Sequence, residues 1–296
     1  MADLHVTVAG VDFSNPLIAA SGTFGFGREY NEFYPLSTLG GISSKGITLK
    51  ERLGNPPPRI AEAPGCMLNA IGLQNPGVDY FIEHDLPWLK EQGTVVIANI
   101  AGNTPEEYCA MAEKLSDTNV DMLEMNISCP NVKEGGVQFG TSCIGVEQIT
   151  AAVRKHCTKP LMVKLSPNVT DIGDIAASAE AGGADAISMI NTLTGMRIDI
   201  QTRRPIIRNN TGGVSGPALL PIAVRMIIPI VGMGGVSNWK DAVELMLAGS
   251  TALQIGTAFF TNPYAPVEII EGLNKYLDEN GISSVTELTG KMIPWG

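Results

Sequence analysis

The chain has 296 residues, 44% of them hydrophobic, which is enough to bury the core of one large domain spanning residues 1–296. It carries 20 Lys and Arg against 30 Asp and Glu, a formal net charge of −10, and this acidic balance argues against nucleic acid as a partner. The longest apolar stretches are too short for a bilayer span and are interrupted by Asn99, Arg225 and Pro229, so no membrane-spanning helix is expected.

The N-terminal residues lack the basic start and apolar run of an export signal, which predicts a cytoplasmic protein. The five cysteines are scattered and form no Cys-x-x-Cys pair; they are Cys66, Cys109, Cys129, Cys143 and Cys157. We therefore expect reduced thiols rather than disulfides or metal ligands.

Short β-like runs alternate with amphipathic stretches of helical length, which is typical of repeated β-α units in the α/β class. Runs 5–8 and 11–13 predict a small N-terminal hairpin that covers the bottom of a barrel. Eight later runs predict the parallel strands of a (β/α)8 TIM barrel, at 17–20, 41–45, 95–100, 122–127, 161–165, 186–190, 229–232 and 252–256. Thr104-Pro105 and Ser237-Asn238 carry the signals of helix N-termini.

The seventh unit is unusually short, because the helix expected after Pro217 reaches only Met226 before the next strand begins. An αβ connection normally has a few loop residues. Either the unit is abbreviated or residues are missing from the sequence near Met226-Ile227, and we favour the second interpretation.

Reactive groups of such barrels project from the C-terminal strand ends, where loop insertions lengthen that face. The groups expected there include no carboxylate, which favours an anionic ligand; they are Ser21, Lys45, Asn99, Asn126, Cys129, Lys164, Asn191, Gly234-Gly235 and Gly256-Thr257. Glycine pairs after the last two strands can close around a phosphate, either of a phosphorylated substrate or of flavin mononucleotide, FMN.

Lys164 lies inside an apolar strand, where an unpaired ammonium would be costly, so it requires an anionic partner. That partner is either a ligand or a structural ion pair. Cys129 follows a strand end and precedes Pro130, which predicts that it faces the pocket, either as a reactive thiol or as a small buried residue. The loop 133–137 after it is long enough to act as a lid.

A long excursion between the second and third strands contains Asn69, whose amide could meet a polar heterocycle. Together these segments resemble dihydroorotate dehydrogenase from the hairpin to the final strand. The resemblance is carried by Ala20-Ser21-Gly22-Thr23-Phe24-Gly25-Phe26-Gly27, Gly54-Asn55-Pro56-Pro57-Pro58-Arg59, Met67-Leu68-Asn69, Asn126-Ile127-Ser128-Cys129-Pro130-Asn131, Ile190-Asn191-Thr192 and Gly212-Gly213-Val214-Ser215-Gly216-Pro217. The first of these and Gly72-Leu73-Gln74-Asn75-Pro76-Gly77 resemble the NAD-linked class 1B catalytic subunit.

The resemblance implies oxidation of (S)-dihydroorotate to orotate in pyrimidine (UMP) biosynthesis, with hydride transfer to bound FMN and Cys129 as general base. It places FMN contacts on Ser21, Lys45, Gly46, Asn99, Asn126, Lys164, Ile190, Gly216, Gly234, Gly235, Gly256 and Thr257. It places substrate contacts on Lys45, Asn69, Ala70, Ile71, Gly72, Leu73, Asn126, Asn191 and Thr192. No metal site is implied.

Class 1B resemblance also implies a homodimer of this chain within a heterotetramer, whose second subunit carries FAD and a 2Fe-2S cluster and passes electrons to NAD. Cys66, beside the substrate-binding turn, is a second candidate thiol. Three alternatives stay open: a fumarate-linked class 1A enzyme, a Schiff-base aldolase using Lys164 on a phosphorylated substrate, and a non-enzymatic flavin-binding or docking barrel.

Overall fold

The eight predicted parallel strands close into a barrel in the structure, a computed structural model that describes residues 2–128, 137–227 and 230–295. They are β3 (Leu17–Ala19), β4 (Gly41–Ser43), β7 (Val95–Ile100), β8 (Met122–Asn126), β9 (Leu161–Lys164), β10 (Ala186–Met189), β15 (Ile230–Met233) and β16 (Ser250–Ile255). Each strand pairs in parallel with the next in this order, and β16 returns to β3 through Leu253 and Leu17. The predicted TIM barrel is therefore confirmed.

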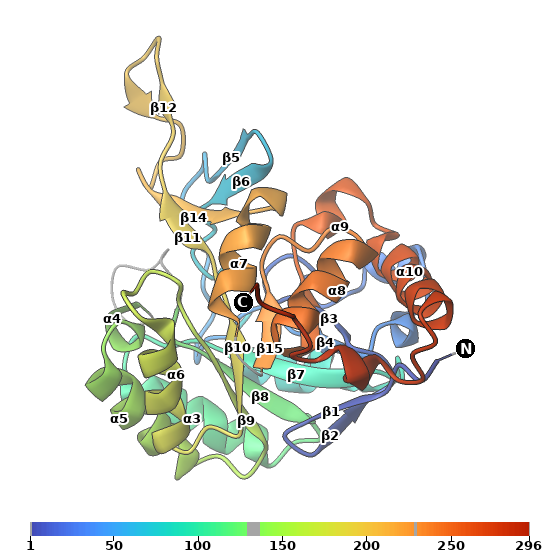
Figure 1. Ribbon diagram of the computed structural model, residues 1–296. Helices are drawn as coiled ribbons and strands as arrows, with labels where there is room; N and C mark the ends of the chain where they lie inside the picture. Colours follow the sequence, from blue (N-terminus) through green and yellow to red (C-terminus); the bar gives the residue numbers. More distant parts are fainter. Residues whose placement is uncertain (1, 129–136, 228–229, 296) are drawn as a thin grey trace.

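Helices surround the barrel on its outside (Figure 1). They are α1 (Val78–Tyr80), α2 (Leu86–Lys90), α3 (Pro105–Ser116), α4 (Val137–Gly140), α5 (Cys143–Arg154), α6 (Ile172–Ala181), α7 (Leu220–Met226), α8 (Trp239–Ala248), α9 (Ala258–Thr261) and α10 (Ala265–Glu279). Single turns occur at η1 (Tyr30–Glu32), η2 (Leu36–Thr38), η3 (Phe81–Asp85), η4 (Pro217–Leu219) and η5 (Val285–Leu288). Among the described residues, no helix has both the length and the apolar character that a membrane crossing requires.

The two predicted helix N-termini are capped as their residues indicate. Thr104 Oγ1 accepts a hydrogen bond from Glu107 N at 3.3 Å, with Pro105 in the first turn of α3. Asn238 and Asp241 form a reciprocal capping box at the start of α8. Both caps satisfy backbone donors that a helix start otherwise leaves unpaired.

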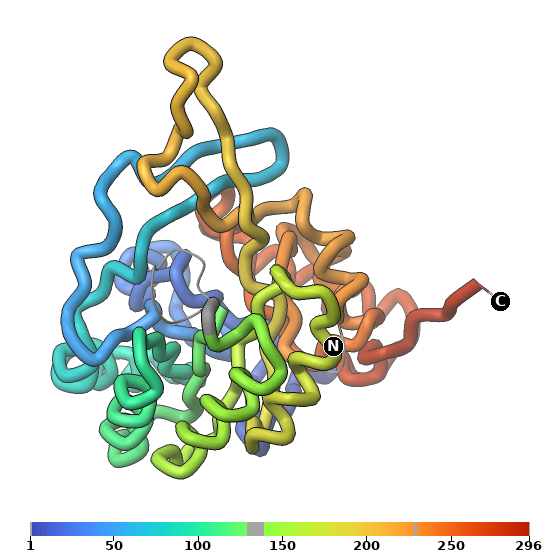
Figure 2. Tube along the Cα trace, turned by 90° about the vertical axis from the view of Figure 1, so that its left-hand side faces the viewer, coloured from blue at the N-terminus to red at the C-terminus, as the bar shows by residue number. Residues whose placement is uncertain are grey.

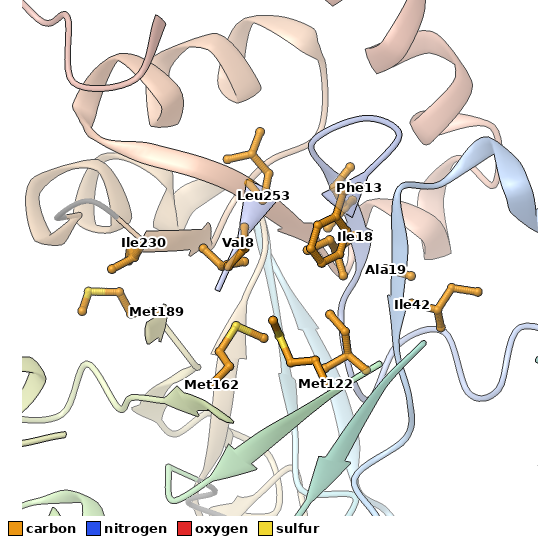
Figure 3. Close-up of a cluster of buried hydrophobic side chains, with 14 of the residues drawn as sticks. Val8, Phe13, Ile18, Ala19, Ile42, Met122, Met162, Met189, Ile230 and Leu253 are labelled. Carbon is orange, nitrogen blue, oxygen red and sulfur yellow. The ribbon is translucent and has the colours of Figure 1, made fainter. Parts of the chain in front are cut away.

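The predicted N-terminal hairpin, β1 (Val6–Val8) with β2 (Val11–Phe13), lies at the lower end of the barrel (Figure 1). Figure 3 shows Val8 and Phe13 of this hairpin among buried side chains of the barrel strands, including Met122 and Leu253. A Cβ atom added to Gly41 would lie 2.8 Å from Phe13 Cε1, so only glycine at position 41 leaves room for the Phe13 ring. The hairpin thus closes the bottom with apolar packing.

A four-stranded antiparallel sheet stands at the opposite end. It consists of β5 (Ile60–Ala63), β6 (Cys66–Asn69), β11 (Leu193–Gly195) and β14 (Gly212–Ser215), in the order β11-β14-β6-β5. Figures 1 and 2 show the excursion after β4 beside the segment after β10, and Asn69 of β6 pairs with Gly213 of β14. A further hairpin, β12 (Ile198–Asp199) with β13 (Arg204–Pro205), projects beyond this sheet.

The seventh unit is short, as expected. Helix α7 has seven residues, ends at Met226, and is preceded by η4. Strand β15 begins at Ile230 and still pairs with both β10 and β16. Residues 228–229 of the connection lie outside the described residues. The barrel thus closes with the seventh unit at this length, and the interpretation that residues are missing near Met226-Ile227 stays a prediction.

Candidate active site

One cavity of about 230 Å³ opens between the C-terminal strand ends and the four-stranded sheet. The structure brings most predicted site residues onto it, namely Ser21, Lys45, Gly46, Asn69, Ile71, Gly72, Leu73, Asn126, Lys164, Ile190, Asn191, Thr192, Gly216, Gly234, Gly235, Gly256 and Thr257. Among the described lining residues, the only charged side chains are the two lysines. The cavity therefore favours an anionic ligand, as the sequence predicted.

Two predicted residues do not line the cavity, and a third lies outside the described residues. Ala70 is fully buried and packs behind the sheet with Leu68. Asn99 is also fully buried, directly behind Gly46, where a Cβ would lie 3.1 Å from the Asn99 Oδ1 atom. Cys129 and residues 133–136 of the expected lid lie outside the described residues, so their roles stay predictions.

The turn that contains Asn69 to Leu73 is held from outside by Asn55. Asn55 N donates to Ile71 O at 2.9 Å, and Asn55 Nδ2 donates to Ala70 O at 3.0 Å. Gly72 and Leu73 both have positive φ values, 76° and 57°, and such a conformation is unfavourable for a leucine. Since Asn55 fixes this turn, Ile71, Gly72 and Leu73 face the cavity in one defined arrangement.

Amide side chains at the ends of β8 and β10 are linked through Ser128. Asn126 Oδ1 accepts hydrogen bonds from Ser128 N at 3.2 Å and Ser128 Oγ at 3.0 Å. Asn191 Nδ2 donates to the same Ser128 Oγ at 2.6 Å. These bonds fix both amides at the cavity wall, and Ser128 immediately precedes Cys129 in the chain.

The glycines after β15 form a left-handed turn, with φ values of 119° at Gly234 and 84° at Gly235. A Cβ at Gly235 would lie 2.5 Å from Leu220 N, so glycine is required by packing as well as by the turn. Among the described residues, none accepts a hydrogen bond from the backbone N–H of Gly234, Gly235 or Thr257. These three donors at the cavity wall can bind a phosphate.

A carboxylate that the sequence analysis missed lies just below the cavity. Strands β4, β8, β10 and β16 alternate with the other four around the barrel, and each contributes one polar side chain to a single interior layer: Ser43, Glu124, Ser188 and Gln254. Glu124 is fully buried at the centre of this layer. Layers built from alternate strands are usual in these barrels, but their side chains are normally apolar.

Both oxygens of Glu124 are fully hydrogen-bonded. Oε2 accepts from Ser43 Oγ and Asn99 Nδ2, each at 2.6 Å, and Oε1 accepts from Ser188 Oγ at 2.7 Å and Gln254 Nε2 at 2.6 Å. Lys164 Nζ lies 3.9 Å from Oε1 and donates to Gln254 Oε1 at 3.1 Å. The anionic partner expected for Lys164 thus includes a structural carboxylate, in addition to any ligand in the cavity.

Burial and charge oppose each other in this pair. Burial alone would raise the pKa of Glu124, but the Lys164 ammonium and hydrogen bonds from Ser43, Ser188 and Asn99 outweigh it and lower the pKa below its usual value. Burial lowers the pKa of Lys164, and the Glu124 carboxylate opposes that shift. Glu124 is therefore a carboxylate at neutral pH, and it favours the charged form of Lys164.

Cys66, the second candidate thiol, is half-buried in β6 but is not among the residues that line the cavity. Burial raises the pKa of Cys109 and Cys157, which lie away from the cavity. None of the four described thiols lines the cavity.

Comparison with known proteins gives one consistent match. The model of the dihydroorotate dehydrogenase family matches residues 3–277. The catalytic subunit of dihydroorotate dehydrogenase B (NAD(+)) from Petrotoga mobilis is 52% identical over 298 residues, covering 98% of this chain and 99% of the relative. The proteins of the same name from Lachnoclostridium phytofermentans and Phocaeicola vulgatus are 54% and 50% identical, covering 97% and 99% of this chain and 98% and 99% of the relatives.

Proposed function

Since the chain belongs to the dihydroorotate dehydrogenase family, we propose that its cavity holds FMN and a flat pyrimidine carboxylate side by side. The enzyme oxidises (S)-dihydroorotate to orotate in pyrimidine biosynthesis, in the NAD-linked manner for which its relatives are named. The match over nearly the whole chain does not favour the fumarate-linked, aldolase or non-enzymatic alternatives. The observation that carries the proposal is that lysines, amides and glycine turns from separate strands open onto one cavity.

The described residues fit FMN. The uncommitted N–H groups of Gly234, Gly235 and Thr257 would bind the phosphate, in keeping with the position of phosphate sites after the last two strands of such barrels. Lys164 lies at the cavity floor, where its charge would stabilise an anionic flavin ring. When bound, FMN supplies the acceptor for a hydride from C6 of the substrate.

The other polar residues fit the pyrimidine. Lys45 would bind the substrate carboxylate through charge, and the amides of Asn69, Asn126 and Asn191 would pair with ring C=O and N–H groups. Asn126 and Asn191 are held by Ser128, so the substrate meets amides that are already oriented. Such fixed donors and acceptors orient the reacting carbon without further ordering on binding.

Cys129 would act as the general base that removes a proton from C5 of the substrate. It follows Ser128, whose hydroxyl joins the two cavity amides, so the chain leads directly from the substrate wall to this thiol. Loss of a proton at C5 and a hydride at C6 together convert the C5–C6 bond to a double bond. A base on one face of the pyrimidine and a hydride acceptor on the other would accommodate both losses.

Electrons leave this chain through a partner, because the relatives are catalytic subunits by name. We propose a second subunit that carries FAD and a 2Fe-2S cluster, assembled with a homodimer of this chain as a heterotetramer. We also propose a cytoplasmic location, with which the four described free thiols agree.

Anaerobic addition of dihydroorotate to the purified chain tests this function. We expect a yellow protein whose visible flavin absorbance is bleached by dihydroorotate and restored by NAD only when the co-purified partner subunit is present. Restoration by fumarate without the partner would contradict the NAD-linked assignment. A colourless protein that borohydride traps covalently with a phosphorylated sugar would contradict the flavin chemistry altogether.

A further inference from the structure

The polar layer centred on Glu124 is the feature that the proposed function leaves unexplained. Barrel interiors are normally filled with apolar side chains, and Met122 and Met162, two residues before Glu124 and Lys164 on β8 and β9, are apolar and fully buried (Figure 3). Directly above them the chain buries a full negative charge and surrounds it with donors from four other strands. A buried charge of this kind is a poor route to stability, because its desolvation offsets its attraction to a partner.

We infer that Glu124 is a positioning residue for the flavin site, which fixes the ammonium of Lys164 and the amide of Gln254 at the cavity floor. The inference rests on the proposed binding of FMN in this cavity. Glu124 does not line the cavity, whereas Lys164 and Gln254 do. It therefore acts on a ligand through these two side chains.

The geometry gives Glu124 control over both groups. Gln254 Nε2 donates to Glu124 Oε1, which turns Gln254 Oε1 toward Lys164 Nζ, and that pair is 3.1 Å apart. Lys164 Nζ is thereby held by an amide oxygen and, at 3.9 Å, by the carboxylate itself. A carboxamide at position 124 would present a donor to these same donors, so the orientation of Gln254 would no longer be fixed.

The layer also sets the charge at the floor. Lys164 is 4% exposed, so its ammonium has little contact with water and depends on Glu124 for compensation. Lys45, the other charged residue on the described cavity wall, is also cationic and cannot supply it. Without Glu124, Lys164 would lose both its anchor and the group that favours its charged form, and an anionic reduced flavin would be held less tightly.

A double-mutant cycle on the full-length, FMN-loaded protein tests this inference, with E124Q, K164M and the E124Q/K164M double variant. The readout is the midpoint potential of the bound flavin, measured by equilibration with reference dyes, and not turnover. We expect E124Q to weaken binding of reduced relative to oxidised flavin by about tenfold, which lowers the potential by ~30 mV for a two-electron couple. In the K164M background, the same substitution should change the affinity for reduced relative to oxidised flavin by less than about twofold.

A rise in the flavin potential on E124Q would identify a different role for Glu124. If Glu124 acted on the flavin directly through its negative charge, E124Q would raise the potential, and would do so beside K164M as well; either result overturns the inference. Failure to bind FMN or to be bleached by dihydroorotate in the wild-type protein would instead refute the proposed function.

The matched control is Asp121→Asn, at the residue immediately before the same strand. Asp121 pairs with Lys90 at 2.6 Å, does not line the cavity, and should leave the flavin potential unchanged. An equal fall in this control would assign the effect to general loosening of β8 and overturn the inference. If E124Q does not fold, E124D replaces it, because aspartate keeps the charge but withdraws the carboxylate oxygens. E124D should lower the affinity for reduced relative to oxidised flavin about threefold, and only when Lys164 is present. No fall in this ratio, or the same fall without Lys164, overturns the inference.

Discussion

Replacing Lys164 with methionine should destabilise the fold far more than an ordinary ion pair would suggest. The substitution keeps the length and apolar stem of the side chain but leaves Glu124 fully buried, with four neutral donors and without a cation at 3.9 Å. Removing one partner of a buried pair costs about 3–5 kcal/mol. With a urea dependence of roughly 3 kcal/mol per molar, the unfolding midpoint should fall by about 1–1.7 M.

The assay is urea unfolding, followed by far-UV circular dichroism, of the full chain freed of flavin, so that ligand binding does not contribute to stability. Lys90→Met is the matched control, because Lys90 pairs with Asp121 at 2.6 Å while both side chains stay more than a quarter exposed. A pair of that kind is worth at most about 1 kcal/mol. Equal losses in the two variants at neutral pH would refute the reasoning from burial.

The penalty of K164M should depend on pH. In the wild type the pKa of Glu124 is lowered, so its contribution to stability is present above the unfolded value of about 4.3 and is lost as the pH falls through the lowered pKa. In K164M we expect burial to raise the pKa of Glu124 above its unfolded value. The folded protein then loses stability as the pH rises through that raised pKa. The difference in free energy of unfolding between wild type and K164M should therefore shrink from pH 7 toward pH 4. A difference that stays constant over this range would contradict the prediction.

Two further predictions concern the ligands. Cys129→Ser should slow single-turnover flavin reduction by dihydroorotate by about 100-fold or more at neutral pH, because a serine hydroxyl is far harder to ionise than a thiol; an unchanged rate would remove Cys129 from the mechanism. Gly235→Ala should weaken FMN binding at least tenfold in an equilibrium titration, because the new Cβ would meet Leu220 N at 2.5 Å. Gly281→Ala, also at positive φ but with no neighbour within 4 Å, should cost only about 1 kcal/mol of stability and leave FMN affinity unchanged.

The barrel strands could be predicted because their signal is local. Each is a short, largely apolar run, and all eight occur where the sequence indicates, with ends that differ by at most two residues. The sheet over the cavity has no such signal, since its strands are three or four residues long and β14 begins with two glycines. Its pairing of Asn69 with Gly213 joins residues 144 positions apart, which sequence periodicity does not reveal.

The polar layer marks a different limit. A lysine inside an apolar strand needs a partner, which predicts one for Lys164. The same argument applied to Glu124, between Leu123 and Met125, identifies that partner. Reasoning from strand ends does not reach Glu124, because it lies two residues before the end of β8. Charged residues within barrel strands therefore merit the same scrutiny as those at the rim.

The central claim is that one cavity holds flavin and pyrimidine in contact, and binding of orotate to the oxidised, FMN-loaded chain tests it most directly. Orotate is already oxidised, so no electron transfer obscures the result. The account predicts a saturable change in the visible flavin spectrum as orotate is added, because the two rings share the space between Lys164 and the amides of Asn126 and Asn191. Orotate that binds by calorimetry and leaves the flavin spectrum unaltered would contradict it.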